Sequence, residues 1–545
     1  MFNGGWLIDD SLYLPHNPLL RDPARLWKIW FAPGSFIEYY PLEETVQWAQ
    51  WRLWGNQTCG YHVTNVGLHI INALLVWRLL DKFGLKLAWL GGLIFIVHPA
   101  AVESVAWISE LKNTLSLPPF LLAMCAWIDY EEQKRPRDYF LALGLFLAAM
   151  LCKISMATFP FVILLYAWWK RERIGWGEIR AAMPFFMVSL TLGVTTMMAG
   201  IWFTTNYHPG PDREAIVAGG VFSRMACAGL AFAFYFSKFF WPIRMMPLYP
   251  QWSFHSLSPW DFLPWPIFWA GTSWLWTKRK SWGRHALLGF GFFLILLAPF
   301  LGFTEITFMR FTRVMDHFLY LPMIGLIGLV VAVLGKIADQ LPRTARPICA
   351  GLLTIMFGLL ACESHGYTGI FVSQEKLWTY TLELNPDSDV AHNNLGLVYL
   401  NSGRLPQAIE QFEAALRAKP DYFFAHNGLG NALFLSGRAE EAIDHYQEAL
   451  RLYPSYPEAH NGLANALLQS GHLAGARAEC VKALKLNPNY VEAHCNLGLI
   501  LDQEGHIPEA IEQFEIALSL HPTDARIQTI LESLRARQQD AVKQK

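Results

Sequence analysis

The sequence has few charged residues for its length. Of its 545 residues 16% are charged, and 43 Lys and Arg against 44 Asp and Glu leave a formal net charge of -1. A protein that binds the nucleic-acid backbone needs a basic surface, so this balance gives no indication of a nucleic-acid partner.

The cysteines also give little indication of function. The eight cysteines form no CxxC pair and no spacing typical of a metal site. Most of them lie in apolar runs, where a free cysteine behaves as a small hydrophobic residue. They give no support for a zinc module, predict no metal ligands and do not identify a redox compartment.

Apolar residues are abundant instead: 53% of the chain is hydrophobic and 14% aromatic, including 23 Trp. Several apolar runs are shorter than the roughly 20 residues of a spanning helix, which is typical of a packed bundle whose helices cover one another. We therefore expect an all-α protein that begins with a polytopic membrane helix bundle. The runs fall at about 61–81, 86–99, 112–130, 139–152, 155–169, 181–203, 221–240, 261–276, 286–303, 318–335 and 347–363.

The distribution of Lys and Arg predicts the orientation of the bundle, because basic connections stay in the cytoplasm. The basic connections are 81–86, 133–137, 170–173, 278–280 and 336–346. Residues before 61, the 98–112 turn, Lys153, the loops 204–220 and 304–317, and everything after 363 are then extracytoplasmic. One crossing is surplus between 204–220 and 278–280, and we predict that 261–276, broken by Pro264 and Pro266, does not span.

The N-terminal segment carries an acidic pair, Asp9 and Asp10, followed by many aromatic residues. Aromatic residues at this density fit a loop on the membrane interface. The adjacent carboxylates are candidates for catalysis, although they can also simply cap a helix. An extracytoplasmic N-terminus without a signal peptide leads us to expect about 20 further apolar residues encoded upstream of Met1.

A turn at residues 98–113 emerges between two apolar runs and holds a carboxylate at the membrane boundary. Pro99 suits the first turn of a helix, and Glu103 follows one turn later, near the positive end of the helix dipole. Ionisable residues at such depth are functional-site candidates. Glu103 is therefore a candidate catalytic residue, and the alternative is a helix-capping acid.

A polar stripe lies in the run before this turn. His62, Asn65, His69 and Asn72 recur at i, i+3, i+7 and i+10, which places them on one face of a helix. In lipid that face must look inward. The stripe and His98 are candidates to contact a phosphate or hydroxyl, and hydrogen bonding between helices is the alternative.

Cations on the predicted extracytoplasmic side are candidates to bind an anion. Lys153 interrupts two apolar runs, where it either anchors the interface or contacts an anion. The loop 304–317 supplies Glu305, Arg310, Arg313, Asp316 and His317. Two arginines on this side run against the positive-inside bias and indicate an anionic partner.

The chain changes character after the last apolar run. Prolines 386, 420, 454, 488 and 522 recur every 34 residues, which is the tetratricopeptide period. We predict four repeats over 389–522, beginning at 389, 423, 457 and 491. The predicted domains are thus the membrane domain 1–363, a linker with a degenerate half repeat 364–388, the repeats, and a capping helix with tail 523–545.

The first helices of such repeats line a groove. Its predicted lining contains Asn393, Asn427, Asn431, Asn461 and Asn465. An asparagine ladder can pair with the backbone of an extended polypeptide without reading its side chains. The alternative is an idle groove in a repeat array that acts as a spacer.

Together these segments resemble a known family. The acidic pair near the start, Tyr61-His62-Val63-Thr64-Asn65, His98-Pro99 with Glu103 to Ile108, Cys152-Lys153, and Met315 to Pro322 before the repeats are similar to the transmembrane and tetratricopeptide-repeat protein O-mannosyltransferase family. The resemblance covers nearly the whole chain. The chain departs from the family at Lys153-Ile154 and at Asp316-His317-Phe318.

This resemblance implies a fold and an activity. It implies a membrane part similar to GT-C glycosyltransferases, which take a sugar from a polyprenyl-phosphate donor. Asp10, Asp9 and Glu103 then become the catalytic carboxylates, with Asp10 as general base. Lys153, Arg310, Arg313 and His317 become candidate contacts for the lipid phosphate.

The predicted function is transfer of a sugar, mannose by this resemblance, to hydroxyl groups of proteins presented by the repeat groove. No cofactor is predicted with certainty, and a divalent metal is possible. The rival interpretation is a membrane-anchored repeat scaffold without catalysis, in which the polar membrane residues serve packing alone. A multi-pass protein of the bacterial inner membrane or endoplasmic reticulum fits both interpretations.

Overall fold

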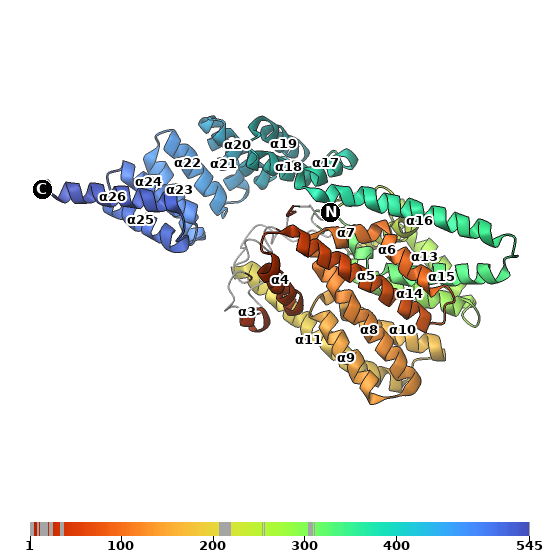
Figure 1. Ribbon diagram of the computed structural model, residues 1–545. Helices are drawn as coiled ribbons and strands as arrows, with labels where there is room; N and C mark the ends of the chain where they lie inside the picture. Colours follow the sequence, from red (N-terminus) through yellow and green to blue (C-terminus); the bar gives the residue numbers. More distant parts are fainter. Residues whose placement is uncertain are drawn as a thin grey trace. The chain divides into compact units, whose positions relative to one another are not determined.

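The computed structural model describes residues 5–7, 10, 20, 26–32, 38–206, 220–252, 254, 257–303, 309 and 311–543. Their contacts divide the chain into two compact units that separate between Leu384 and Asn385. The regular elements assigned within the described residues are helical, as the composition predicts (Figure 1). Each unit is described by itself below.

Each of the eleven predicted apolar runs corresponds to a helix of the first unit. Proline opens several of these helices at a position where its missing N–H has no partner to lose; they include α4, α9, α13 and α16. The helices are α3 (Leu26–Phe31), α4 (Pro41–Trp54), α5 (Thr58–Lys82), α6 (Ala88–Val97), α7 (Val102–Ala106), α8 (Leu111–Gln133), α9 (Pro136–Met150), α10 (Phe159–Arg171), α11 (Trp176–Asn206), α12 (Val221–Phe240), α13 (Pro264–Thr277), α14 (Gly283–Leu297), α15 (Met323–Gln340), α16 (Arg346–Thr368) and α17 (Gln374–Leu384).

Short 3-10 helices connect or extend these elements. They are η3 (Pro99–Ala101), η4 (Ile108–Glu110), η5 (Ile154–Thr158), η7 (Pro259–Phe262), η8 (Ala298–Phe300), η10 (Asp316–Leu319) and η11 (Gly369–Val372). Five segments of the described residues are long and apolar enough to cross a membrane: Thr58–Lys82, Trp176–Phe203, Gly283–Phe300, Met323–Gln340 and Arg346–Val372. A sixth is possible if Ala88–Val97 and Pro99–Ala106, bent by 61°, form one broken span.

The loops of the bundle separate into two ends, as the predicted orientation requires. At one end, which we call the basic end, cations of the connections pair with acids of neighbouring helices: Lys86 with Asp339 at 2.8 Å and Arg284 with Glu172 at 2.6 Å. The other end, which we call the site end, brings together the loops that carry Glu103, Lys153 and His317. The arrangement separates the two kinds of loop, while the side of the membrane on which each lies stays a prediction.

The helices α12 and α13 correspond to the two apolar runs of which we predict that only one spans. His98 at the site end contacts the carbonyl of Phe239 near the end of α12, and Arg224 near its start contacts the carbonyl of Phe303. Trp265 of α13 contacts α12, and Trp276 stacks on Trp168, which lies just before the basic connection 170–173. Pro264 and Pro266 lie in the first turn of α13, and neither α12 nor α13 is among the five segments of the described residues that are long and apolar enough to cross a membrane, so the failure of 261–276 to span stays a prediction.

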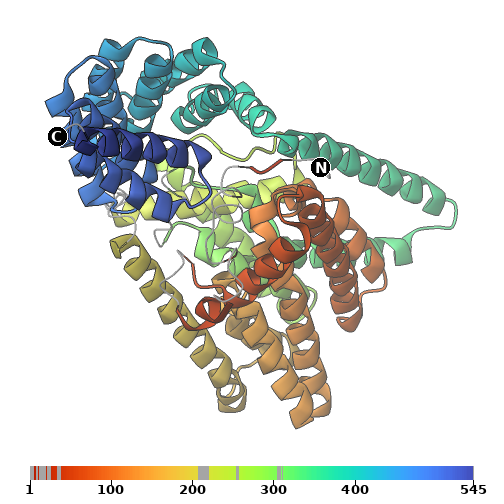
Figure 2. The same ribbon diagram turned by 60° about the vertical axis from the view of Figure 1, so that its left-hand side comes forward.

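Within its described residues the second unit contains four helix pairs and a final helix, which can be followed in Figures 1 and 2. The pairs begin at the predicted positions and are α18 (Asp389–Asn401) with α19 (Leu405–Ala418), α20 (Phe423–Leu435) with α21 (Ala439–Leu452), α22 (Pro457–Gln469) with α23 (Leu473–Leu486), and α24 (Val491–Gln503) with α25 (Ile507–Leu520). The last helix is α26 (Ala525–Lys543), and its Ile527, Leu531 and Leu534 complete the core of the last repeat. The turn inside each pair needs a positive φ, which Gly403, Gly437, Gly471 and Gly505 supply with values of 72° to 82°.

Candidate functional site

A buried acid and a histidine form the centre of the site end. The side chain of Glu103 is fully buried on α7. Its Oε1 lies 2.8 Å from Nδ1 of His317, and its Oε2 accepts a hydrogen bond of 3.1 Å from the backbone N–H of the same residue. Both carboxylate oxygens of Glu103 are therefore held by one residue that is 214 positions away in the chain.

The local sequence explains how Glu103 reaches this place. His98 caps η3 by accepting a hydrogen bond from the N–H of Ala100 at 3.2 Å, and Pro99 opens that helix. Glu103 then falls in the first turn of the next helix, α7, rather than one turn into the helix that Pro99 opens. His98 also lies 3.0 Å from the carbonyl of Phe239 and stacks on its ring, so its contacts within the described residues serve to join the turn to α12.

His317 is oriented by this contact. When Nδ1 donates to Glu103, Nε2 of the neutral ring carries the lone pair and is the atom available to accept a proton. The ring packs against Phe318, which in turn stacks on Phe300 at 4.2 Å. Among the described residues, no hydrogen-bond partner of Nε2 is found, so this carboxylate–imidazole pair has the geometry of a general base with its orienting acid.

Asp316 is a second buried acid beside this pair, and its role was not predicted. Its carboxylate accepts hydrogen bonds from Tyr249 at 2.8 Å, from Tyr367 at 3.1 Å and from the N–H of Met246 at 3.1 Å. Burial and then the charge of Glu103 raise the pKa of Asp316 to about 7, despite these hydrogen bonds. Asp316 thus links η10 to α16 and to the segment after α12.

Lys153 is buried at the site end and donates a hydrogen bond to Oδ1 of Asn113. The amide of Asn113 in turn donates to Glu110. The ammonium of Lys153 lies 5.9 Å from the ring centroid of Phe300 and 6.0 Å from that of Phe318. Lys153 therefore lies near the rings of Phe300 and Phe318, and the second of these also packs against His317.

Burial and neighbouring charges have opposite effects on the pKa values of Lys153 and Glu110. Burial lowers the pKa of Lys153 to about 8, while the negative charge of Glu110 counteracts this effect. Burial also acts to raise the pKa of Glu110, but the positive charges of His317, Lys112 and Lys153 outweigh it and lower that pKa. A cation held here by few anions remains able to attract the charge of a ligand.

Asp10 joins the N-terminal segment to the 98–113 turn. Its Oδ1 accepts a hydrogen bond of 2.7 Å from the N–H of Ser109, and its Oδ2 accepts one of 2.9 Å from the N–H of Leu7. The structure thus brings Asp10 to the turn that carries Glu103. Asp9 lies outside the described residues.

The polar stripe of α5 faces inward, as predicted, and bonds to neighbouring elements. Asn65 donates to the carbonyl of Trp107 at 3.2 Å, and His69 lies 2.9 Å from the hydroxyl of Tyr320. Asn72 donates to the carbonyl of Thr114 at 2.9 Å. These contacts favour hydrogen bonding between helices for the three residues, while His62 is buried at the same face.

The loop before η10 contributes less than expected to the described site. Arg313 is half-buried, and its charge acts on Cys227 of α12. Glu305 and Arg310 lie outside the described residues. The predicted contacts of Arg310 and Arg313 with a lipid phosphate stay predictions.

One helix at the site end was missed by sequence reasoning. The buried residues of α4 include Glu43, Glu44, Gln47 and Gln50. Their spacing of three and four residues marks one helix face, and this signal was readable in the sequence. It was overlooked because the segment was interpreted as an aromatic loop on the membrane interface.

The asparagines of the repeats lie on the first helices, as predicted. Asn393, Asn427 and Asn461 are buried. Asn427 donates to the hydroxyl of Tyr456 at 3.4 Å, and Asn461 accepts from Asn496 at 2.7 Å. The further groove residues are half-buried: Asn431, which accepts from Tyr446 at 2.7 Å, and Asn465.

A histidine recurs in every repeat and was not predicted to act. Each lies 2.9 to 3.0 Å from the carbonyl of the proline six positions earlier, and its other nitrogen contacts the second helix of the repeat. These residues are His392, His426, His460 and His494. The contacts tie the chain entering each repeat to its helix pair, which indicates a structural role.

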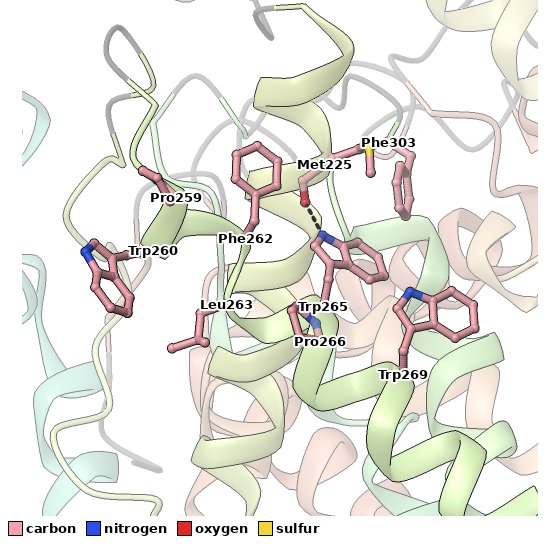
Figure 3. A pocket seen from close by; sticks show the side chains of 9 residues that line it. All are labelled: Met225, Pro259, Trp260, Phe262, Leu263, Trp265, Pro266, Trp269 and Phe303. Atoms are coloured by element: carbon pink, nitrogen blue, oxygen red, sulfur yellow. Dashed lines mark hydrogen bonds between the residues drawn. The ribbon is translucent and has the colours of Figure 1, made fainter.

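An apolar pocket of about 540 Å³ lies between α12, η7 and α13. Figure 3 shows Trp260, Trp265 and Trp269 around it, with Trp265 donating to the carbonyl of Met225. The described residues of its wall include no charged side chain. Within the described part of the chain, no group of three or more His, Cys, Asp or Glu side chains could hold a metal ion.

Comparison with known proteins bears on both units. Tetratricopeptide repeat models match residues 377–457, 433–482 and 491–524, and a TPR repeat model matches 464–505. The protein O-mannosyl-transferase F38B6.6 of Caenorhabditis elegans is 22% identical over 441 residues, which cover 76% of this chain and 60% of that protein. The protein O-mannosyl-transferase TMTC1 of Homo sapiens is 24% identical over 481 residues, 76% of this chain and 53% of that protein.

The predicted resemblance to tetratricopeptide-repeat O-mannosyltransferases is confirmed. These relatives match the membrane part as well as the repeats, since 76% of the chain is more than the second unit contains. The chain spans somewhat more than half the length of each of these two O-mannosyl-transferases. Their activity comes to this chain only as a proposal.

Solved structures of tetratricopeptide repeat proteins are similar to part of this chain. The crystal structure of YrrB, described as a TPR protein with an unusual peptide-binding site, is 23% identical and covers 30% of this chain and 85% of that one, with a TM-score of 0.27. A crystal structure of MamA is 24% identical and covers 28% and 89%, with a TM-score of 0.25. No function is inferred from these two likenesses.

Proposed function

We propose that this chain transfers a mannosyl group from a polyprenyl-phosphate donor to hydroxyl groups of proteins on the extracytoplasmic side of a membrane. The observation that supports it most is the Glu103–His317 pair, buried at the site end of an apolar bundle whose relatives are named O-mannosyl-transferases. A bundle of this kind offers the apolar surroundings that a lipid-linked donor needs.

The reaction requires a proton acceptor. An acceptor hydroxyl attacks the anomeric carbon of the donor, its oxygen forms the new glycosidic bond, and its proton must leave. In this proposal Nε2 of His317 takes the proton, while Glu103 orients the ring and stabilises the imidazolium that forms. Asp10 was the sequence-based choice of base, and it remains a candidate at the same turn.

The reaction also requires stabilisation of the leaving group. As the bond between the anomeric carbon and the phosphate oxygen breaks, the polyprenyl phosphate takes the electron pair and gains negative charge. Lys153, whose ammonium has two donors beyond the one used by Asn113, would stabilise that charge. The repeat groove would hold the protein acceptor through its asparagines.

The test is transfer of radiolabelled mannose from polyprenyl-phosphate-mannose to endogenous protein in membranes with and without this chain. Label that depends on the chain supports the proposal. If the chain captures envelope proteins but no label transfers, the rival scaffold replaces it.

A further inference from the structure

The helix α4 has an inverted distribution of polar and apolar residues. Glu43, Glu44 and Gln47 are at most 6% exposed, whereas Leu53 on the same helix is 72% exposed. An inward polar face is expected in lipid, but burying polar groups costs free energy unless they find partners. The polar face of α4 therefore requires an explanation within the molecule.

The buried face of α4 lies at the site end. The N–H of Leu42 donates to the carbonyl of Leu151 at 3.1 Å, which fixes the first turn of α4 to the loop that carries Lys153. Just before α4, Glu38 pairs with Lys112 at 3.1 Å, next to Asn113 in the 98–113 turn. The helix is thus attached to both loops that hold the cation.

The polar groups of this face are not satisfied by one another. Gln47 donates to Glu43, but Oε1 of Gln47, Oε2 of Glu44 and Nε1 of Trp48 are buried without a hydrogen-bond partner. Three such atoms on one helix are unusual, because buried polar atoms in folded proteins nearly always have partners. Two of the three accept hydrogen bonds and one donates, so they suit a ligand with hydroxyl groups, each of which does both.

The protonation state of Glu43 and Glu44 indicates whether the buried face of α4 suits a charged or a neutral ligand. Burial raises the pKa of Glu43 to about 8, with a smaller opposing effect of Lys112, and burial also raises the pKa of Glu44. Near neutral pH Glu43 is therefore largely an uncharged carboxylic acid, which can donate as well as accept a hydrogen bond, and burial acts against the charged form of Glu44 in the same way. This pattern favours a neutral polyhydroxyl ligand over a cation or an anion.

We propose that the buried polar face of α4, through Glu44, Gln47 and Trp48, binds the sugar ring of the lipid-linked donor. The inference rests on the proposed function, because a sugar whose phosphate contacts Lys153 must lie within a few ångströms of that residue. The α4 face is attached to the loop of Lys153 and offers unpaired hydrogen-bonding atoms of the kind that sugar hydroxyls require. Sugar binding would satisfy atoms that the protein alone leaves without partners.

The test compares the full-length double variant Glu44→Leu/Gln47→Leu with the parent in lipid nanodiscs. If the two residues only fill space, the variant loses the hydrogen bond from Gln47 to Glu43, which costs some stability but leaves donor binding unchanged. If they bind the sugar, the variant stays folded, but its Kd for polyprenyl-phosphate-mannose rises about 10-fold, the scale of one or two lost hydrogen bonds. Its Kd for polyprenyl phosphate without sugar stays unchanged.

Two further variants complete the design. Glu132→Leu at the basic end, where Glu132 is half exposed and 3.8 Å from Lys170, is the matched control and should leave both Kd values unchanged. Glu44→Gln, which keeps the shape of the side chain, serves if the double variant does not fold, and it should weaken sugar-dependent binding by a smaller factor. An unchanged preference for the mannosylated donor in a folded α4 variant overturns the inference alone. Failure of the parent to prefer that donor, together with no transfer, overturns the proposed function as well.

Discussion

Glu103 accepts two hydrogen bonds from His317, one from the ring at 2.8 Å and one from the backbone N–H at 3.1 Å. The first oxygen sets which ring nitrogen carries the proton, and the second fixes the start of η10 against α7. A carboxylate that served only to cap its own helix would bind the N–H groups of α7 instead. The pair therefore joins two segments that the sequence keeps far apart.

The first prediction concerns this pair. Glu103→Gln keeps the volume and one acceptor but removes the charge that stabilises the imidazolium, so transfer should fall by roughly 100-fold or more while the protein still inserts. His317→Gln should have a similar effect, and the double variant should cost about as much as either single one, because the residues act as a unit. Initial rates of mannose transfer measure all three.

The control for these variants is another buried acid. Glu131→Gln removes a carboxylate that pairs with Arg171 at the basic end, so it tests the cost of losing a buried charge away from the site. Transfer per folded molecule should stay within about 3-fold of the parent. Full activity of Glu103→Gln would reject the mechanism.

Lys153 should determine the alkaline limit of the reaction. Its pKa is lowered by burial to about 8, so its ammonium loses the proton as the pH rises through that value. Transfer should then decline above about pH 8 if the charge stabilises the leaving phosphate. Lys153→Arg should extend activity to higher pH because a guanidinium keeps its charge, and Lys153→Met should lower transfer at every pH. A pH profile of the arginine variant identical to that of the parent would contradict this role.

Asp316 should make the free energy of unfolding fall as the pH rises. An aspartate whose pKa is lowered by folding would have the opposite effect. Its pKa is raised in the folded state to about 7, above the unfolded value near 3.8, so the folded state binds the proton more tightly. The stabilising contribution is complete below about pH 4 and is lost as the pH rises toward 7. Thermal unfolding in detergent should show this decline in the parent and a weaker decline in Asp316→Asn. Equal slopes for the two proteins would exclude Asp316 as the cause.

The asparagines of the groove should act on protein acceptors alone. Asn427→Ala with Asn461→Ala removes two side chains that could pair with an extended backbone, so capture of a protein acceptor should weaken about 10-fold. Transfer to a short peptide should be spared, because it does not need the groove. The exposed Asn401, replaced by Ala, is the control. Equal loss with protein and peptide would place the effect in the stability of the repeats.

The orientation of the repeats can be tested with a thiol reagent that does not cross membranes. Ser388 is unsuitable because its side chain caps α18 and is buried. Asp421→Cys offers an exposed position, once the exposed Cys59 and Cys362 have been replaced. Labelling in intact cells is expected, and protection until lysis would place the repeats in the cytoplasm.

The sequence by itself determined the helices and the repeats. Apolar runs and a 34-residue proline period are local patterns, so their helices begin within a few residues of the predicted positions. The sequence also identified Glu103, Lys153 and Asp10 as candidate site residues. Charged residues near a membrane boundary cost free energy in any fold, so their position alone indicates a function. Only the tertiary structure decided their partners. The contact of Glu103 with His317, the burial of Asp316 and the inward polar face of α4 depend on how distant helices pack, and no local pattern encodes that packing.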